Sequence, residues 1–132
     1  MAAMMQFDLV SPEKLLASFE ASQIEVPGAE GDFTAMADHA ALVTTMRPGL
    51  LKATSASDTA EYVVTGGFVE VSGKAISVLA EIAIPRADIT RADVDAMVAA
   101  AQEAATNASP EIKDTADKRL ADTQILADLL AL

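Results

Sequence analysis

From residue 7 to residue 84 the chain consists of short apolar runs separated by residues that favour turns. We interpret as strands, in chain order, residues 7–10, 22–26, 41–46, 62–64, 68–71 and 75–79. Between them lie Pro27-Gly28, Pro48-Gly49, Gly66-Gly67 and Ser72-Gly73-Lys74, which supply the fixed or positive φ angles that turns need. Many short strands at such close spacing predict a sandwich or a barrel.

Polar and apolar residues alternate in several of these runs, which is typical of a strand with one face on a core. Ile24 and Val26 flank Glu25, and valines likewise flank Glu70. Two layers that pack face to face are the economical way to bury one face of every strand. We therefore predict an antiparallel β-sandwich for residues 1–86.

After Pro85 the pattern changes to alanine-rich sequence without glycine. Thr90 and Asp93 form an acidic variant of the capping box, and Asp88 is the alternative N-cap of the helix that follows. Apolar residues then recur at helical spacing, at Val94, Met97, Val98, Ala101 and Ala105. We expect this helix to end at residues 106–108.

A second helix start follows at Ser109-Pro110-Glu111, with an N-cap serine, a proline at the first helical position and an acid in the first turn. One face of this helix would carry Ile112, Ala116, Leu120, Thr123, Ala127 and Leu130. The short connection favours an antiparallel hairpin. The predicted class is therefore α+β, mainly β, with an N-terminal antiparallel sandwich followed by a C-terminal antiparallel two-helix hairpin at residues 87–132.

The charge balance excludes whole classes of partner. The net charge is -11, and the nine Lys and Arg residues are scattered along the chain. Nucleic acids need clustered cations against their phosphates, and anionic lipids need them on the polar face of a helix. We expect no nucleic-acid partner and no direct membrane insertion.

Nothing in the sequence predicts a membrane span or a secretory signal. No apolar run approaches the roughly 20 residues that cross a bilayer, and residues 1–10 lack a basic start with an apolar stretch. The sequence contains no cysteine, which excludes disulfides and thiolate chemistry and fits a reducing compartment. We expect a soluble, intracellular protein.

Few residues suggest catalysis. His39 is the single histidine, and with Asp38 alone it cannot build a tetrahedral zinc site. Gly66-Gly67 continues into a strand, whereas a phosphate-binding loop opens a helix. We predict no catalytic residue, no metal and no cofactor. From the residues alone, two rival functions stay open: a free-standing ligand-binding sandwich with a helical dimerisation tail, and a small hydrolase that uses His39.

The order and spacing of five sequence blocks are more specific than any single residue. These blocks are residues 7–13, 24–33, 39–49, 62–71 and 78–81. Together with the helical tail they resemble the epsilon subunit of bacterial F-type ATP synthases, the counterpart of the mitochondrial delta subunit, across nearly the whole chain. The family fold is a β-sandwich followed by a helical hairpin.

The resemblance implies a mechanical function. In the family, the sandwich binds the gamma subunit of the central stalk and sits on the polar loops of the proton-carrying c-ring, so that all three turn as one rotor. The expected location is peripheral, on the cytoplasmic face of the bacterial inner membrane. Glu30, Gly31, Asp32 and His39 match the region that faces gamma and the ring, and are the candidate interface residues.

The loop around His39 departs from the family pattern. Ala37, Asp38 and Ala41 stand where Pro, Gly or Asn, and Pro are usual. The resemblance therefore does not carry over the rigidity of this loop or its fine contacts.

Some family members bind ATP as a regulatory ligand, through a motif of Ile or Leu, Asp, two variable residues, Arg and Ala. One register aligns Asp95 with the acid of this motif but places Val98 on its arginine. The other register keeps Asp88 and Arg91 but loses the leading aliphatic residue. Asp95, Asp88 and Arg91 are thus the candidate ATP-binding residues.

In inhibitory relatives an extended, basic hairpin meets acidic segments of the beta subunit in the head formed by alpha and beta. Here residues 87–132 contain four basic and nine acidic side chains. Moving a hairpin from mostly folded to mostly extended needs about 5 kcal/mol of differential binding, and like charges oppose it. We expect weak or absent inhibition of ATP hydrolysis.

Overall fold

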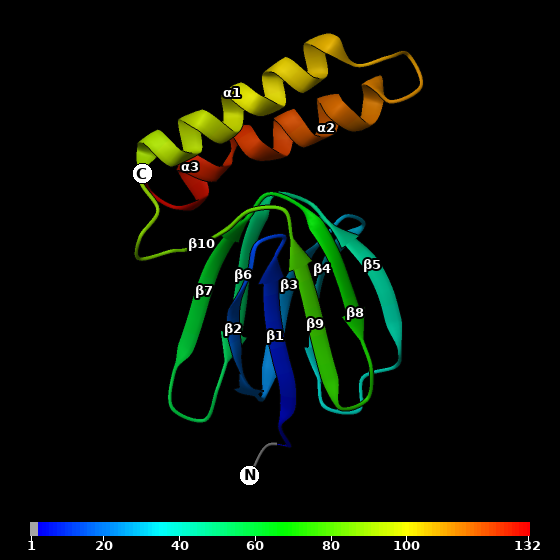
Figure 1. The fold of residues 1–132 in the computed structure, drawn as a ribbon, viewed down its shortest axis with the longest axis vertical. Coiled ribbons are helices and arrows are strands. Elements are labelled where there is room, and N and C mark those ends of the chain that lie inside the picture. The colour runs from blue at the N-terminus through cyan, green and yellow to red at the C-terminus, as the bar shows by residue number, and fades with distance from the viewer. Residues whose placement is uncertain (1–2) are drawn as a thin grey trace. The chain divides into compact units, whose positions relative to one another are not determined.

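The computed structural model describes residues 3–132, which divide into two compact units between Arg86 and Ala87 (Figure 1). The first unit contains the strands and the second contains the helices. The predicted fold class is confirmed, since the structure is mainly β, with a sandwich followed by a helical hairpin.

Ten strands build the first unit. They are β1 (Met5–Ser11), β2 (Lys14–Ala21), β3 (Gln23–Gly28), β4 (Gly31–Met36), β5 (Leu42–Met46), β6 (Gly49–Thr54), β7 (Thr59–Val64), β8 (Gly67–Val71), β9 (Ala75–Ala80) and β10 (Ala83–Pro85). Six of them contain the runs interpreted as strands in the sequence. The apolar pattern did not predict β2, β4, β6 or β10.

The strands pair in the order β10-β7-β6-β3-β5-β8-β9-β1-β2, and β4 also pairs with β3. Strands β3 and β5 pair only at Gly28 and Met46, so this point joins one layer, β4-β3-β6-β7-β10, to the other, β5-β8-β9-β1-β2. The prediction of a wholly antiparallel sandwich needs one correction, because β1 and β9 pair in parallel. The seven strands between them in sequence provide the long connection that parallel pairing requires.

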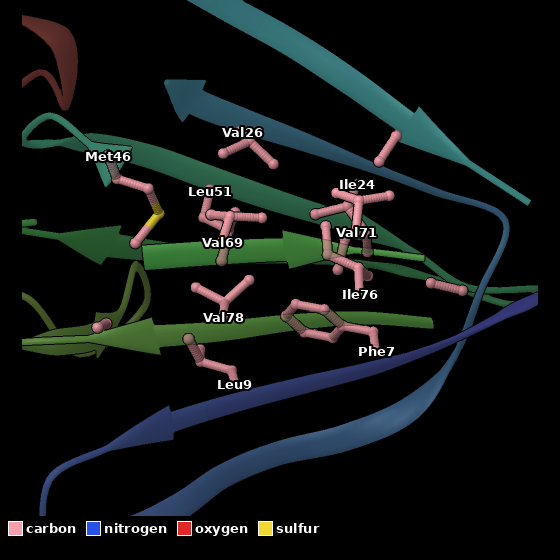
Figure 2. Close-up of a cluster of buried hydrophobic side chains, with 14 of the residues drawn as sticks. Phe7, Leu9, Ile24, Val26, Met46, Leu51, Val69, Val71, Ile76 and Val78 are labelled. Carbon is pink, nitrogen blue, oxygen red and sulfur yellow. The ribbon is translucent and has the colours of Figure 1, made fainter. Parts of the chain in front are cut away.

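Alternate residues of the strands fill the core with aliphatic side chains (Figure 2). The one aromatic pair in the described core is Phe7 against Phe19, edge-on with ring centroids 5.2 Å apart. Fully or almost fully buried members include Leu9, Ile24, Val26, Leu51, Val69, Val71, Ile76 and Val78. Because inward residues alternate with outward ones, the same strands also present two outer faces.

Pro27-Gly28 was predicted to be a turn, but it forms the end of β3. The turn comes at Ala29 and Glu30, directly before β4. A Cβ at Gly28 would lie only 2.5 Å from the main-chain oxygen of Gly31. This position therefore needs glycine because two strands approach closely, and not because a turn requires a positive φ.

The first predicted helix is confirmed as α1 (Arg91–Asn107), including its capping box. The Thr90 hydroxyl accepts from the Asp93 amide at 3.2 Å, and the Asp93 carboxylate accepts from the Thr90 amide at 2.9 Å. The buried positions are Val94, Met97, Ala101 and Ala105, as the helical spacing indicated.

The predicted start of the second helix is wrong. The structure has α2 (Lys113–Gln124) and a short α3 (Leu126–Leu129), and the N-cap of α2 is Ile112 without a side-chain hydrogen bond. The Glu111 carboxylate instead accepts hydrogen bonds from the amide of Glu111 itself and from the Ser109 side chain, and these bonds lower the pKa of that carboxylate. Lys113 reaches across the hairpin, and its Nζ donates to the Ala105 carbonyl at 2.7 Å.

The β7–β8 connection generates a first prediction. Gly67 has a φ of 136°, and a Cβ there would lie 2.0 Å from the main-chain oxygen of Leu79. We expect Gly67→Ala to lower the free energy of unfolding by at least about 3 kcal/mol, because strain and steric overlap add. The measurement is the urea midpoint of the purified chain.

The matched control is Gly73→Ala in the β8–β9 turn, where a Cβ would meet nothing within 4 Å. This variant should remain within about 0.5 kcal/mol of the parent chain. Equal midpoints for the two variants would contradict the close approach at Gly67.

Candidate functional site

Three of the four predicted interface residues lie together at the tip of the β3–β4 hairpin, which we call the tip and define as residues 28–32. Glu30 is exposed in the turn, and Gly31 opens β4 with a φ of 139°. Asp32 lies within β4, directly after Gly31. The Asp32 side chain is 76% exposed although it pairs with Arg47.

His39 lies in the loop between β4 and β5, as predicted, but it does not join the tip. Its ring is tilted against the ring of Phe33, with centroids 6.3 Å apart. Its Nδ1 lies 2.7 Å from the Ala40 carbonyl, and its amide donates to the Met36 carbonyl at 3.0 Å. These contacts indicate that His39 helps to stabilise the loop between β4 and β5.

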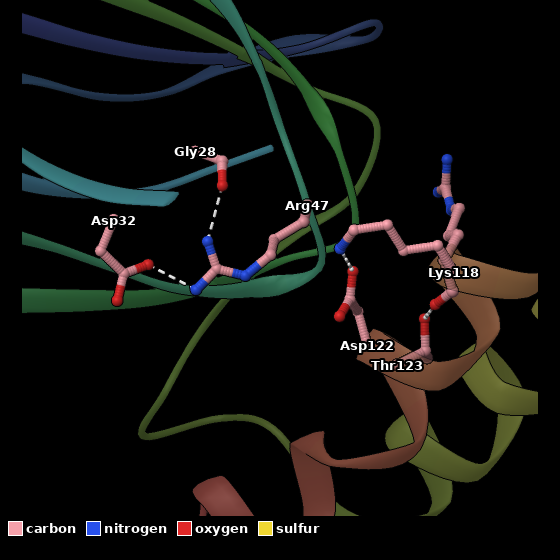
Figure 3. Close-up of polar contacts among 7 residues, drawn as sticks. Gly28, Asp32, Arg47, Lys118, Asp122 and Thr123 are labelled. Carbon is pink, nitrogen blue, oxygen red and sulfur yellow. Dashed lines mark hydrogen bonds and ion pairs between the residues drawn. The ribbon is translucent and has the colours of Figure 1, made fainter. Parts of the chain in front are cut away.

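Arg47 is the residue of this region that the sequence reasoning missed. It follows β5, and its guanidinium donates to the Gly28 carbonyl at 2.6 Å and to the Asp32 carboxylate (Figure 3). The signal that could have found it is a lone cation directly before Pro48-Gly49 in a chain with few basic residues.

The outer face of the layer β5-β8-β9-β1-β2 carries an exposed apolar row. Register places Phe68 opposite Leu79, Leu79 beside Val10, and Val10 opposite Leu15, across four neighbouring strands. Phe68 is 58% exposed, Leu79 48% and Leu15 59%. We call these four residues the outer row.

A polar row with two acids runs beside the outer row. Glu70 pairs with Ser77, Ser77 with Asp8, and Asp8 with Ser18. The Asp8 carboxylate accepts from Ser18 Oγ at 2.6 Å and from Gln6 Nε2 at 3.0 Å, and these bonds lower the pKa of Asp8. The acid therefore stays ionised at neutral pH, beside an apolar surface.

The outer face of the other layer has a different character. Glu25 on β3 lies opposite Lys52 on β6, and Lys52 lies opposite Glu61 on β7. Arg86 continues this line, with its Nη1 2.7 Å from Glu61 Oε2. Alternating charges of this kind are typical of a solvated face, so the apolar row of the first layer is the better candidate for a partner surface.

Two of the three candidate ATP-binding residues are in contact. Arg91 Nε lies 3.2 Å from Asp95 Oδ1, one helical turn along α1. Arg91 Nη1 also donates to the main-chain oxygen of Leu132 at 3.2 Å. Asp88 is exposed in the turn before α1. The guanidinium thus already has two oxygen partners within the hairpin.

Within residues 3–132 no group of His, Asp and Glu is arranged to hold a metal ion. In the same range, none of the helices has the length and apolar character that a bilayer span demands.

Comparison with known proteins identifies both the fold and the family. Residues 4–86 match the family model described as ATP synthase, Delta/Epsilon chain, beta-sandwich domain. The ATP synthase epsilon chain of Rhodobacter capsulatus is 51% identical over 132 residues, which is 100% of both chains. That of Fuscovulum blasticum is 51% identical over 126 residues, covering 96% of this chain and 95% of the relative.

Solved structures share the fold at lower identity. A chain in the Euglena gracilis mitochondrial ATP synthase superposes with a TM-score of 0.73 at 19% identity, covering 98% of this chain and 83% of that one. A chain in the Tetrahymena thermophila mitochondrial ATP synthase central stalk and c-ring gives 0.67 at 20% identity, covering 98% of each chain.

Proposed function

The chain belongs to the family of ATP synthase epsilon chains, non-catalytic subunits of the central stalk, and we propose that its sandwich binds the gamma subunit and the polar loops of the c-ring. In this role the chain makes and breaks no covalent bond. It transmits torque: protons turn the ring, and ring, sandwich and gamma rotate together as one body. Family membership at full length also sets aside the free-standing binding module and the hydrolase.

The observation that carries the proposal is the outer row. Exposed Phe68, Leu79 and Leu15 lie side by side on a rigid sheet, where contiguous apolar surface marks a protein interface. The ionised Asp8 and the exposed Glu70 lie next to this row. The matching surface of gamma should therefore be apolar with cations at its edge.

The tip is the second surface that we assign to a partner. Glu30 and Asp32 are exposed acids at the end of a hairpin, which suits polar loops better than an apolar groove. The Ala29 amide donates to the Thr45 carbonyl at 2.9 Å, and Thr45 pairs with Phe68. The tip thus adjoins one end of the outer row, so that the two surfaces are continuous. His39 is assigned to the same interface by resemblance, through its loop.

The chain is part of a membrane-associated complex, and we propose that it lies peripherally on the cytoplasmic face of the bacterial inner membrane. An acidic chain of this kind is held there by gamma and the ring, and not by lipid.

The hairpin supports only weak regulation of ATP hydrolysis through the beta and alpha subunits. Arg91 pairs with Asp95, Lys113 with Asp117, and Lys118 with Asp122, each within one helix. Figure 3 shows the pair of Lys118 and Asp122, which are 2.9 Å apart. With nine acids in residues 87–132, the hairpin presents negative charge. An acidic partner would repel it.

The outer row gives a prediction on gamma binding. We expect Phe68→Asp to weaken the affinity for purified gamma by roughly tenfold or more, because a charge would be buried against an apolar surface. The control is Thr59→Asp, which adds the same charge at an exposed strand position of the other layer. Pull-down titration with tagged chains measures both, and equal affinities for the two variants would refute the assignment.

A chain that ends at Arg86 should still capture gamma and assemble. We expect the assembled complex to hydrolyse ATP within about twofold of the rate with the intact chain, which corresponds to about 0.4 kcal/mol. Steady-state hydrolysis of both complexes is the measurement. A rise of roughly tenfold or more on truncation would show that this hairpin does inhibit.

Direct binding of ATP should be weak, because Asp88, Asp93 and Asp95 lie within four residues of Arg91 in the sequence. We expect calorimetric titration of the intact chain to give a dissociation constant above about 1 mM. Arg91→Ala should not alter it. Micromolar binding that Arg91→Ala abolishes would instead establish the nucleotide site that the resemblance suggests.

A further inference from the structure

Arg47 makes three hydrogen bonds to the end of the β3–β4 hairpin. Its amide donates to the Pro27 carbonyl at 3.0 Å. Its Nη1 donates to the Gly28 carbonyl at 2.6 Å, and its Nη2 pairs with Asp32, as Figure 3 shows. The Arg47 side chain is only 28% exposed. A partly buried guanidinium with a carboxylate and a carbonyl as acceptors forms a stronger contact than an ordinary surface ion pair.

The tip would otherwise have little support. Strand β4 pairs with β3 and lies off the main path of the strand order. The link from β3 to β5 in the other layer is the single pair Gly28–Met46. Arg47 directly follows Met46, so its side chain reinforces the link at the place where the two layers meet.

We propose that Arg47 is a positioning residue, which fixes the acidic tip relative to the outer row so that contacts to the ring and to gamma are made by one rigid body. This inference rests on the proposed function. In this arrangement the exposed Glu30 contacts the ring, whereas Asp32 contributes chiefly by pairing with Arg47. Arginine suits this task better than lysine because its planar fork serves two acceptors at once.

The structural test follows the Ala29 amide, which donates to the Thr45 carbonyl close to Arg47. In the full chain, Arg47→Gln should speed hydrogen exchange at this amide by roughly tenfold, the loss expected for a charge-assisted hydrogen bond. Arg47→Lys should give an intermediate rate, and Lys74→Gln, in the β8–β9 turn, should leave it unchanged. Exchange at Ala29 that is equal in all four proteins would overturn the proposal.

The functional test measures binding to purified gamma and to purified c-ring separately. Arg47→Gln should leave gamma capture unchanged and weaken ring binding by roughly tenfold, with partial rescue in Arg47→Lys. Asp32→Asn should weaken ring binding as well, but should add nothing in the Arg47→Gln background. Independent, additive losses would show that Asp32 contacts the ring directly. They would overturn the proposal that Asp32 acts by pairing with Arg47.

Failure of the proposed function and failure of the role of Arg47 give different results. If the unaltered chain binds neither gamma nor the ring, the proposed function fails and the inference fails with it. If the unaltered chain binds both, and Arg47→Gln binds the ring as tightly, only the role of Arg47 is wrong.

Discussion

The sandwich depends on one narrow link, the pairing of Gly28 with Met46 that joins β3 of one layer to β5 of the other. The two strands must approach closely there. A Cβ at Gly28 would overlap the main chain at Gly31, and one at Gly49 would lie 2.8 Å from Pro27 Cβ. Glycine at these two positions lets β3 turn tightly into β4 and lets β6 begin against Pro27. Because glycine allows this close approach, the tip can lie against the end of β5.

The core is mainly aliphatic, and this makes an exposed aromatic side chain on the sheet unusual. With only four phenylalanines, one tyrosine and no tryptophan, the chain fills its interior with valine, leucine, isoleucine and methionine on alternate strand positions. Phe68 is placed outside, at a position where alternation would favour a polar residue, and its neighbours across the strands are also apolar. A large aromatic side chain on the surface of a chain with so few of them is typical of a protein interface, which is the role that we propose for the outer row.

Local pattern predicted the strands whose alternation is clear, the first helix and its capping box, because these depend on short-range spacing. It missed β4 because Gly31 and Asp32 resemble turn residues, and β6 because Pro48-Gly49 precedes it. The predicted start of α2 was wrong because the Ser109 side chain bonds to Glu111 and does not cap the helix. Arg47 could not be found from spacing at all, since its partners Gly28 and Asp32 lie far back in the chain and meet it only through the fold.

The cations of the two units make different sets of contacts. In the sandwich, Arg47 and Arg86 join segments distant in sequence, so the charges stabilise tertiary structure. In the hairpin, Arg91, Lys113 and Lys118 pair with acids four residues on, and Arg91 and Lys113 also donate to the main-chain oxygens of Leu132 and Ala105. A basic surface for an acidic partner would need these cations unpaired and in excess. The sandwich is therefore suited to the rigid-body role that we propose for it, and the hairpin offers little attraction to an acidic partner.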